Sequence, residues 1–128
     1  MKRVMQALST CLLAVLLFLI AGCAGAPATL KSAKDKMEKN GYTVTVKEYE
    51  KNSTEYEHGL KGILYAYDNK EVLALTAYLF TDPYYAEKKD KELRKASPVK
   101  LQTKLVKKWL LVEGTENHHV YAISVFEG

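Results

Sequence analysis

The chain has 128 residues, with 19 basic and 15 acidic side chains and a formal net charge of +4 at pH 7. This length suits one domain and is short for two. Basic and acidic residues are interleaved and do not gather into the patch or stripe that is typical of a nucleic-acid-binding protein. The composition therefore predicts one small domain and no nucleic-acid partner.

The N-terminal segment has the charge and hydropathy pattern of a secretory signal. Lys2 and Arg3 precede an unbroken apolar run from Cys11 to Ala21. A transmembrane helix needs about 20 apolar residues to cross the hydrocarbon core, and this run has roughly half that number. Residues 1–22 are therefore predicted to be a signal and not a permanent membrane span.

Residues 19–23, Leu-Ile-Ala-Gly-Cys, resemble the lipobox of bacterial lipoprotein precursors, with an aliphatic residue three positions before the cysteine and small residues directly ahead of it. The resemblance covers only the signal and its cleavage site. It implies cleavage between Gly22 and Cys23 and a diacylglycerol on the Cys23 sulfur. The protein would then be anchored in the cell membrane or outer membrane, facing outside the cytoplasm. The alternative is an ordinary secretory signal cut after Ala24 or Ala26, which would discard Cys23.

The processed chain would be less basic than the precursor. Loss of Lys2 and Arg3 leaves 17 basic side chains against 15 acidic ones, a formal net charge of +2. Cys23 would be the only cysteine and would carry lipid, so no disulfide is expected. Two or three acyl chains make such anchoring effectively permanent. Residues 23–28 are expected to be a short tether that keeps a single domain, residues 29–128, close to the membrane.

The first part of this domain is predicted to contain a helix and a strand. Residues 30–39 have apolar residues at helical spacing, Thr29 is a suitable N-cap, and Gly41 is a suitable stop. Residues 42–47 alternate apolar and polar side chains, as a half-buried strand does. Residues 50–59 are polar and are expected to form a loop.

The segments 60–67 and 72–80 are predicted to form a β-hairpin across the turn-like residues 68–71. With Tyr67 opposite Val72, a wholly apolar face forms from the pairs Ala66–Leu73, Leu64–Leu75, Gly62–Ala77 and Leu60–Leu79. The other face is a mixed aromatic and β-branched surface made by Lys61, Ile63, Tyr65, Tyr67, Val72, Ala74, Thr76, Tyr78 and Phe80. A slip by one residue would exchange the faces, so the apolar pattern supports this pairing.

The C-terminal part is predicted to continue with a surface helix over residues 83–95, capped by Asp82. Residues 103–106 and 109–113 then favour a second hairpin, although one continuous strand is an alternative. From Thr115 onward a helix is favoured over a strand, because its first residues suit a helix start. Together these elements predict an α+β fold, an antiparallel sheet of four or five strands with two or three helices packed on one face.

No catalytic arrangement is evident in the sequence. There is no Gly-x-Ser-x-Gly elbow, no spare thiol and no glycine-rich phosphate loop. The best metal candidates are His118 and His119 with Glu116, but adjacent histidines on a helix point about 100 degrees apart and suit one metal less well than an i, i+4 pair. We therefore expect no catalytic residue, no metal and no cofactor.

Four aromatic residues of the first hairpin form the candidate binding surface: Tyr65, Tyr67, Tyr78 and Phe80. Tyrosine supplies a large contact area at small entropic cost, so an uncovered face of this kind would suit a peptide, a glycan or a partner protein. The alternative is that the face packs under Trp109 or a helix, or only adds cross-strand pair stability.

These features predict a lipid-anchored cell-envelope protein that acts as a noncatalytic binding or accessory module. Its partners would be the membrane, through lipid on Cys23, and an envelope protein or peptide. Alternatives are an inhibitor or immunity-type lipoprotein, or a small envelope hydrolase or metal-dependent enzyme that uses His118 and His119. Beyond the lipobox, the domain resembles, in style only, small uncharacterised bacterial lipoproteins built as one α+β unit.

Overall fold

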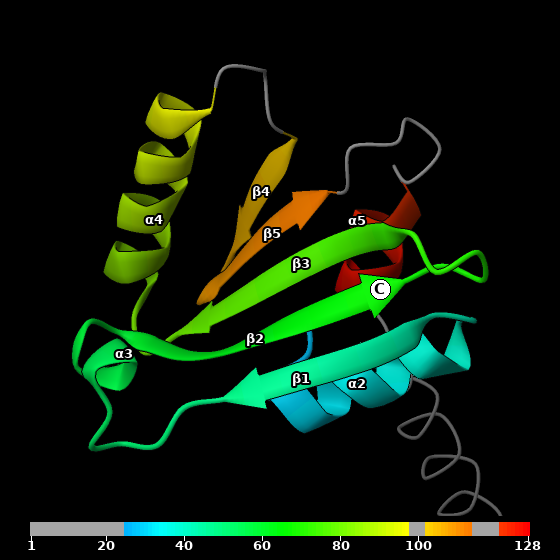
Figure 1. Ribbon diagram of the computed structural model, residues 1–128, viewed down its shortest axis with the longest axis horizontal. Coiled ribbons are helices and arrows are strands. Elements are labelled where there is room, and N and C mark those ends of the chain that lie inside the picture. Colours follow the sequence, from blue (N-terminus) through cyan, green and yellow to red (C-terminus); the bar gives the residue numbers. More distant parts are fainter. Residues whose placement is uncertain (1–24, 98–101, 114–120) are drawn as a thin grey trace, which may run out of the picture.

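The computed structural model describes residues 25–97, 102–113 and 121–128 (Figure 1). Five strands form one antiparallel sheet in the order β1-β2-β3-β5-β4. The strands are β1 (Thr43–Glu48), β2 (Leu60–Tyr67), β3 (Leu73–Phe80), β4 (Thr103–Val106) and β5 (Trp109–Glu113). The helices in the described ranges are α2 (Leu30–Lys39), α3 (Thr54–Glu57), α4 (Pro83–Ala96) and α5 (Tyr121–Glu127). The α+β class, the five-stranded sheet and the second hairpin are confirmed, and the predicted C-terminal helix is present over Tyr121–Glu127; its predicted start at Thr115 lies outside the described residues.

Helix α2 begins and ends where the sequence predicts. The Thr29 side chain accepts a hydrogen bond from the Ser32 backbone N–H at 3.1 Å, and the Ser32 hydroxyl accepts one from the Thr29 N–H at 3.2 Å. At the other end Gly41 has a φ of 93°, and the Tyr42 N–H bonds to the Met37 carbonyl at 3.1 Å. This is a Schellman end, in which glycine takes the left-handed conformation that stops the helix.

The β2–β3 hairpin keeps the predicted faces between its two bulges, but it does not have the predicted register. Ala66 lies opposite Leu75 and not Leu73, because a β-bulge interrupts the ladder between Ala66 and Tyr67. The other observed pairs on this face are Leu64 with Ala77 and Gly62 with Leu79. From Gly62 to Ala66 the pairing differs from the prediction by two residues, so these side chains stay on their predicted faces. Beyond the bulges the prediction is wrong, because Leu60 pairs with and packs against Phe80, and Ala74 packs on the apolar face with Leu75.

The turn between β2 and β3 explains the shift. The Asp68 carboxylate accepts hydrogen bonds from the backbone N–H groups of Lys70 at 2.8 Å and Val72 at 3.0 Å. Val72 is therefore held in the turn and does not begin the strand. The positive φ of 62° falls on Glu71 and not on Asn69, the residue that tolerates it best.

The polar segment 50–59 is not entirely a loop. Residues 54–57 form the short helix α3, whose N-cap Ser53 accepts a hydrogen bond from the Tyr56 N–H at 3.2 Å. A single helical turn is too short for its apolar spacing to stand out in the sequence, and this one buries none of its residues. The prediction of an uninterrupted loop is therefore wrong at this turn.

The main core lies between one face of the sheet and the helices α2 and α5. Its largest fully buried side chains include Met37, Leu64, Leu75, Trp109 and Phe126. The rings of Trp109 and Phe126 meet edge to face, with their centres 4.7 Å apart. This geometry is the one that aromatic quadrupoles favour, so it joins α5 firmly to the start of β5.

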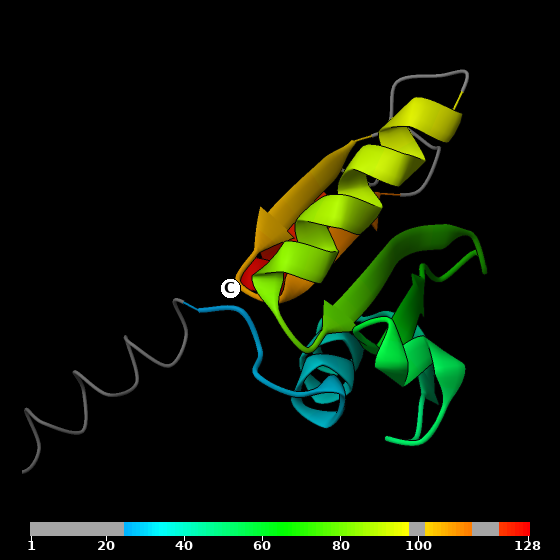
Figure 2. The same cartoon turned by 90° about the vertical axis from the view of Figure 1, so that its left-hand side faces the viewer.

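Helix α4 lies on the opposite face of the sheet, which corrects the prediction that all helices pack on one face. Figures 1 and 2 show it on the side of the β4–β5 hairpin away from α5. Phe80, Ala86 and Leu110 form a second buried cluster there. Because β3 and β5 carry large apolar side chains on both faces, each face needs its own cover.

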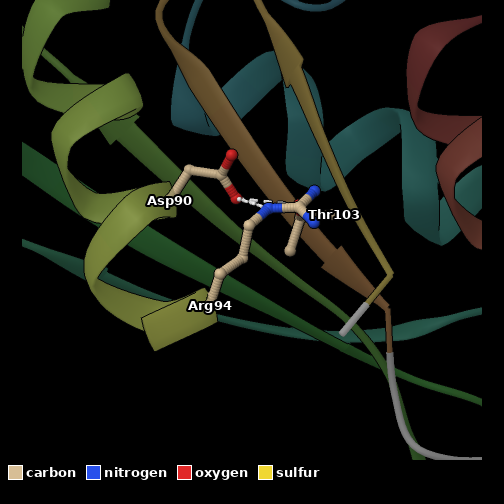
Figure 3. A network of polar contacts seen from close by, with 3 residues as sticks. All are labelled: Asp90, Arg94 and Thr103. Atoms are coloured by element: carbon tan, nitrogen blue, oxygen red, sulfur yellow. Dashed lines mark hydrogen bonds and ion pairs between the residues drawn. The ribbon is translucent and has the colours of Figure 1, made fainter. Parts of the chain in front are cut away.

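A polar network fixes α4 against β4 (Figure 3). The Asp90 carboxylate accepts hydrogen bonds from the Thr103 hydroxyl at 2.8 Å and from Arg94 Nε at 3.1 Å, and Arg94 also donates to Thr103. The Asp90 side chain is only 13% exposed. Its partners therefore compensate most of the hydration that the carboxylate loses.

The close approach of α2 to β2 predicts that Gly62→Ala destabilises the fold. A Cβ at this position would overlap Leu30 Cδ1 and lie 2.8 Å from the Lys47 carbonyl oxygen, which is backbone and cannot rotate away. We expect the free energy of unfolding to fall by about 1–3 kcal/mol in urea denaturation. Gly25→Ala is the matched control, because a Cβ there meets nothing within 4 Å. Equal stability of the two variants would contradict the close packing.

Candidate functional site

One half of the second sheet face is left uncovered by α4. On this half lie Tyr65 and Tyr67 of β2 and Tyr49, which directly follows β1, and Tyr78 of β3 lies at its border, against the cluster that α4 covers. These four residues are called the tyrosine face below. Strand pairing places them together, since Tyr65 lies opposite both Thr45 and Thr76, and the Tyr49 N–H bonds to the Lys61 carbonyl at 2.9 Å. All four side chains are partly exposed.

Three of the four predicted surface residues belong to this face, and Phe80 does not. Its side chain is 4% exposed, within the cluster that α4 covers. The ring still stacks with Tyr78, with the centres 6.3 Å apart and the planes 25° from parallel. Phe80 therefore supports the tyrosine face from beneath α4 and offers no contact area to a partner.

Two lysines lie over tyrosine rings of this face. Lys47 Nζ is 5.4 Å from the centre of the Tyr49 ring, and Lys89 Nζ, from α4, is 6.0 Å from the centre of the Tyr78 ring. Both distances suit a cation–π interaction. The β1, β2 and β3 positions that point to this side carry no Asp or Glu. Carboxylates lie at its borders, where Glu50 lines a hollow with Tyr49 and Glu92 lines one with Lys89.

Sequence reasoning missed Tyr49 and Lys89. Tyr49 continues the two-residue alternation of β1 through Thr45 and Lys47, and that signal was present in the sequence. Lys89 belongs to α4, whose apolar residues Tyr85, Ala86 and Leu93 mark its packing edge but do not show which face of the sheet it covers. Only the position of α4 on the second face brings this lysine to Tyr78.

Burial changes the chemistry of Tyr78. Its pKa is raised above the usual 10.0, first by loss of hydration and then by the neighbouring phenols of Tyr65 and Tyr49. The Tyr78 phenol thus stays protonated and able to donate a hydrogen bond at high pH. Rings, hydroxyls and ammonium groups together can bind an anionic or aromatic ligand, but they include no activated nucleophile.

A hollow of about 380 Å³ lies between α3 and α4 and shares Lys89 with the tyrosine face. His58 lines it, and its Nδ1 lies 2.9 Å from the Thr54 carbonyl oxygen. This contact ties the imidazole to the backbone of α3. Gly59 packs directly against the Tyr85 ring, with a φ of 92°. The hollow therefore extends the candidate surface and shows no catalytic pairing.

The remaining predicted site residues lie outside the described ranges: Gly22, Cys23, Glu116, His118 and His119. Within those ranges, no three His, Cys, Asp or Glu side chains are grouped so that they could hold a metal ion. None of the helices in the described part of the chain is long and apolar enough to span a bilayer.

The described part of the expected tether lies against the domain. Trp109 Nε1 donates a hydrogen bond to the Pro27 carbonyl at 2.7 Å, and Lys36 Nζ donates to the Gly25 carbonyl at 3.3 Å. Ala26 packs against the main core. Residues 25–28 are therefore fastened to the side of the sheet that carries α2 and α5.

Comparison with protein-family models, curated proteins and solved structures finds no match for the chain. Its function must therefore be inferred from its own residues.

The raised pKa of Tyr78 predicts how stability changes at alkaline pH. The unfolded chain loses the phenol proton near pH 10, whereas the folded protein holds it longer, so folding stability falls as the pH rises from 10 through the raised pKa. Tyr78→Phe should show a smaller fall in urea denaturation between neutral and alkaline pH. Tyr84→Phe, which changes a residue that is 61% exposed, is the control and should keep the fall of the unmodified protein. Identical pH profiles for all three proteins would contradict the burial of Tyr78.

Proposed function

We propose that the protein is a noncatalytic binding module of a bacterial cell envelope, anchored by lipid on Cys23, and that it binds an acidic segment of a partner protein on the tyrosine face. The single observation that carries the binding proposal is the uncovered group of tyrosines with Lys47 and Lys89 over its rings. The anchoring proposal rests on residues 19–23 and on the apolar run before them.

The tyrosine face has the composition of a recognition surface. Tyrosine side chains combine a large apolar ring with a hydroxyl and have few rotatable bonds, so they lose little entropy on binding. Three of the four rings lie on paired strands, which hold them in fixed positions. A partner would therefore meet a surface that is already ordered.

The charge of this surface favours an acidic partner. Lys47 and Lys89 bring two ammonium groups, and no carboxylate lies at the strand positions that point to this side. A carboxylate that approaches Tyr49 or Tyr78 can accept a hydrogen bond from a phenol and lie near an ammonium group at the same time. A peptide with both acidic and apolar side chains can contact the ammonium groups and the rings together, whereas a neutral glycan offers the ammonium groups no charge.

No specific observation favours the alternatives. An inhibitor or immunity-type lipoprotein would use the same surface on an enzyme of the same membrane, and it stays a prediction. The hydrolase and metal-enzyme alternatives depend on His118 and His119, which lie outside the described residues.

Metabolic labelling tests the anchor. Cells that express the full chain are grown with an alkyne analogue of palmitic acid, and the purified protein is coupled to a fluorescent azide. We expect label on the unmodified protein and none on Cys23→Ala. Cys11→Ala is the matched control, because it changes the other cysteine of the chain, inside the predicted signal, and should keep the label. Label that persists on Cys23→Ala would contradict the lipobox interpretation.

Titration with simple charged peptides tests the binding surface. A chain that begins at Ala24 is labelled with ¹⁵N and titrated with oligo-glutamate and with oligo-lysine. We expect amide shifts on β1, β2 and β3 with oligo-glutamate only. Replacing both Lys47 and Lys89 with Gln should raise the Kd for oligo-glutamate roughly fivefold per lysine, since each lysine contributes about 1 kcal/mol to the binding free energy.

The matched control replaces Lys31 and Lys34 with Gln, which makes the same charge change on α2, on the other side of the sheet. This variant should keep most of the affinity. Equal losses in the two double variants would show that oligo-glutamate responds only to net charge and would refute the tyrosine face as its site.

A further inference from the structure

The chain that follows the proposed lipid attachment is held to the domain almost from its beginning. Trp109 is 1% exposed, and the Pro27 carbonyl accepts the hydrogen bond from its indole N–H. Release of this segment would leave a buried donor without its partner, which native structures avoid. Ala26 adds an apolar contact with the main core. The contacts between this segment and the domain are therefore part of the fold.

Lys36 joins this segment to both covering helices. From α2 its ammonium group donates to the Gly25 carbonyl at 3.3 Å and to the Phe126 carbonyl of α5 at 2.9 Å. Gly25 is the second residue after Cys23. Two residues reach at most about 7 Å, whereas the six residues 23–28 would reach roughly 20 Å if all of them were free. The lipid would thus be attached within a few ångströms of the α2–α5 side.

The surface around this attachment has small residues and charges of both signs. A shallow hollow of about 850 Å³ lies between the N-terminal segment, α2 and the end of α5, and its lining includes Gly25, Ala28, Asp35, Lys39 and Val125. We call these lining residues the seat. Lys36 and Lys39 both line the hollow, and Asp35 offsets one of these two charges. The Lys36 ammonium group donates to the Gly25 and Phe126 carbonyls, so the seat offers lipid headgroups only a small positive charge. It lies on the side of the sheet that α2 and α5 cover, opposite the tyrosine face.

We propose that the seat rests on the phospholipid headgroups of the membrane that holds the Cys23 lipid, with the tyrosine face turned outward. This proposal rests on the proposed lipid anchor. The short chain between Cys23 and Gly25 orients the domain on the membrane, and attraction to charged headgroups is not required. The partner of the seat is therefore a lipid surface, and zwitterionic phosphatidylcholine is sufficient for it.

Headgroup quenching tests the orientation. The lipidated protein is reconstituted into phosphatidylcholine vesicles that contain a lipid with a nitroxide on its headgroup. A bimane fluorophore is attached to a single introduced cysteine, either Lys39→Cys in the seat or Thr45→Cys, which lies opposite Tyr65 on the other side of the sheet. Both native positions are exposed. We expect quenching at position 39 several times that at position 45, at low and at high salt.

A second variant tests whether the short chain between Cys23 and Gly25 causes the difference in quenching between positions 39 and 45. A flexible insert of about ten Gly and Ser residues between Ala24 and Gly25 lengthens the free chain without changing the seat. Quenching at position 39 should then fall to the level of position 45. Asp35→Cys provides a second seat label and should behave like Lys39→Cys.

Each result decides a different point. Failure of the protein to float with the vesicles would overturn both the lipid anchor and the seat. Flotation with equal quenching at positions 39 and 45 would overturn the seat alone. A difference that survives the insert would overturn the claim that the short connection orients the domain.

Discussion

The rest of the structure depends on the contacts that the Trp109 indole makes. Its ring is buried between the first sheet face and Phe126 of α5, while its N–H needs an acceptor that the sheet does not supply. The Pro27 carbonyl provides this acceptor, so one buried polar group ties the N-terminal segment, the sheet and the C-terminal helix together. The apolar ring must be buried, and its N–H must find an acceptor at the same place. These two requirements fix how three segments that are distant in sequence pack together.

The sheet divides the molecule into two working sides. On the first side α2 and α5 cover the core and hold the N-terminal segment, and on the second α4 covers only part of the strands. The network of Asp90, Arg94 and Thr103 holds α4 on that part. The uncovered remainder is where tyrosines and lysines meet. A proposed anchor on one side and a proposed binding surface on the other is therefore an arrangement that the packing of the helices creates.

Local signals in the sequence predict local structure well here. The bounds of α2 follow from Thr29 and Gly41, whose hydrogen bonds involve only near neighbours. The faces of the β2–β3 hairpin follow from alternation only between its two bulges, because Leu60 and Ala74 lie on the faces opposite to those predicted. The register depends on the bulges and on the Asp68 turn, which the apolar pattern does not reveal. The candidate site was predicted in part: Tyr65, Tyr67 and Tyr78 share a face by alternation, whereas the burial of Phe80 and the approach of Lys89 depend on where α4 packs. Long-range packing of this kind leaves no periodic signal in a single chain.

The double hydrogen bond of Lys36 also determines how the domain would bear force. A lateral pull on an anchor at Cys23 reaches the domain first at the Gly25 and Pro27 carbonyls, which Lys36 and Trp109 hold. The load would then pass into α2 and the interior strand β5, and it would not peel β1 from the edge. Drag on the lipid would therefore move the domain as one body and leave the spacing of the tyrosine rings unchanged.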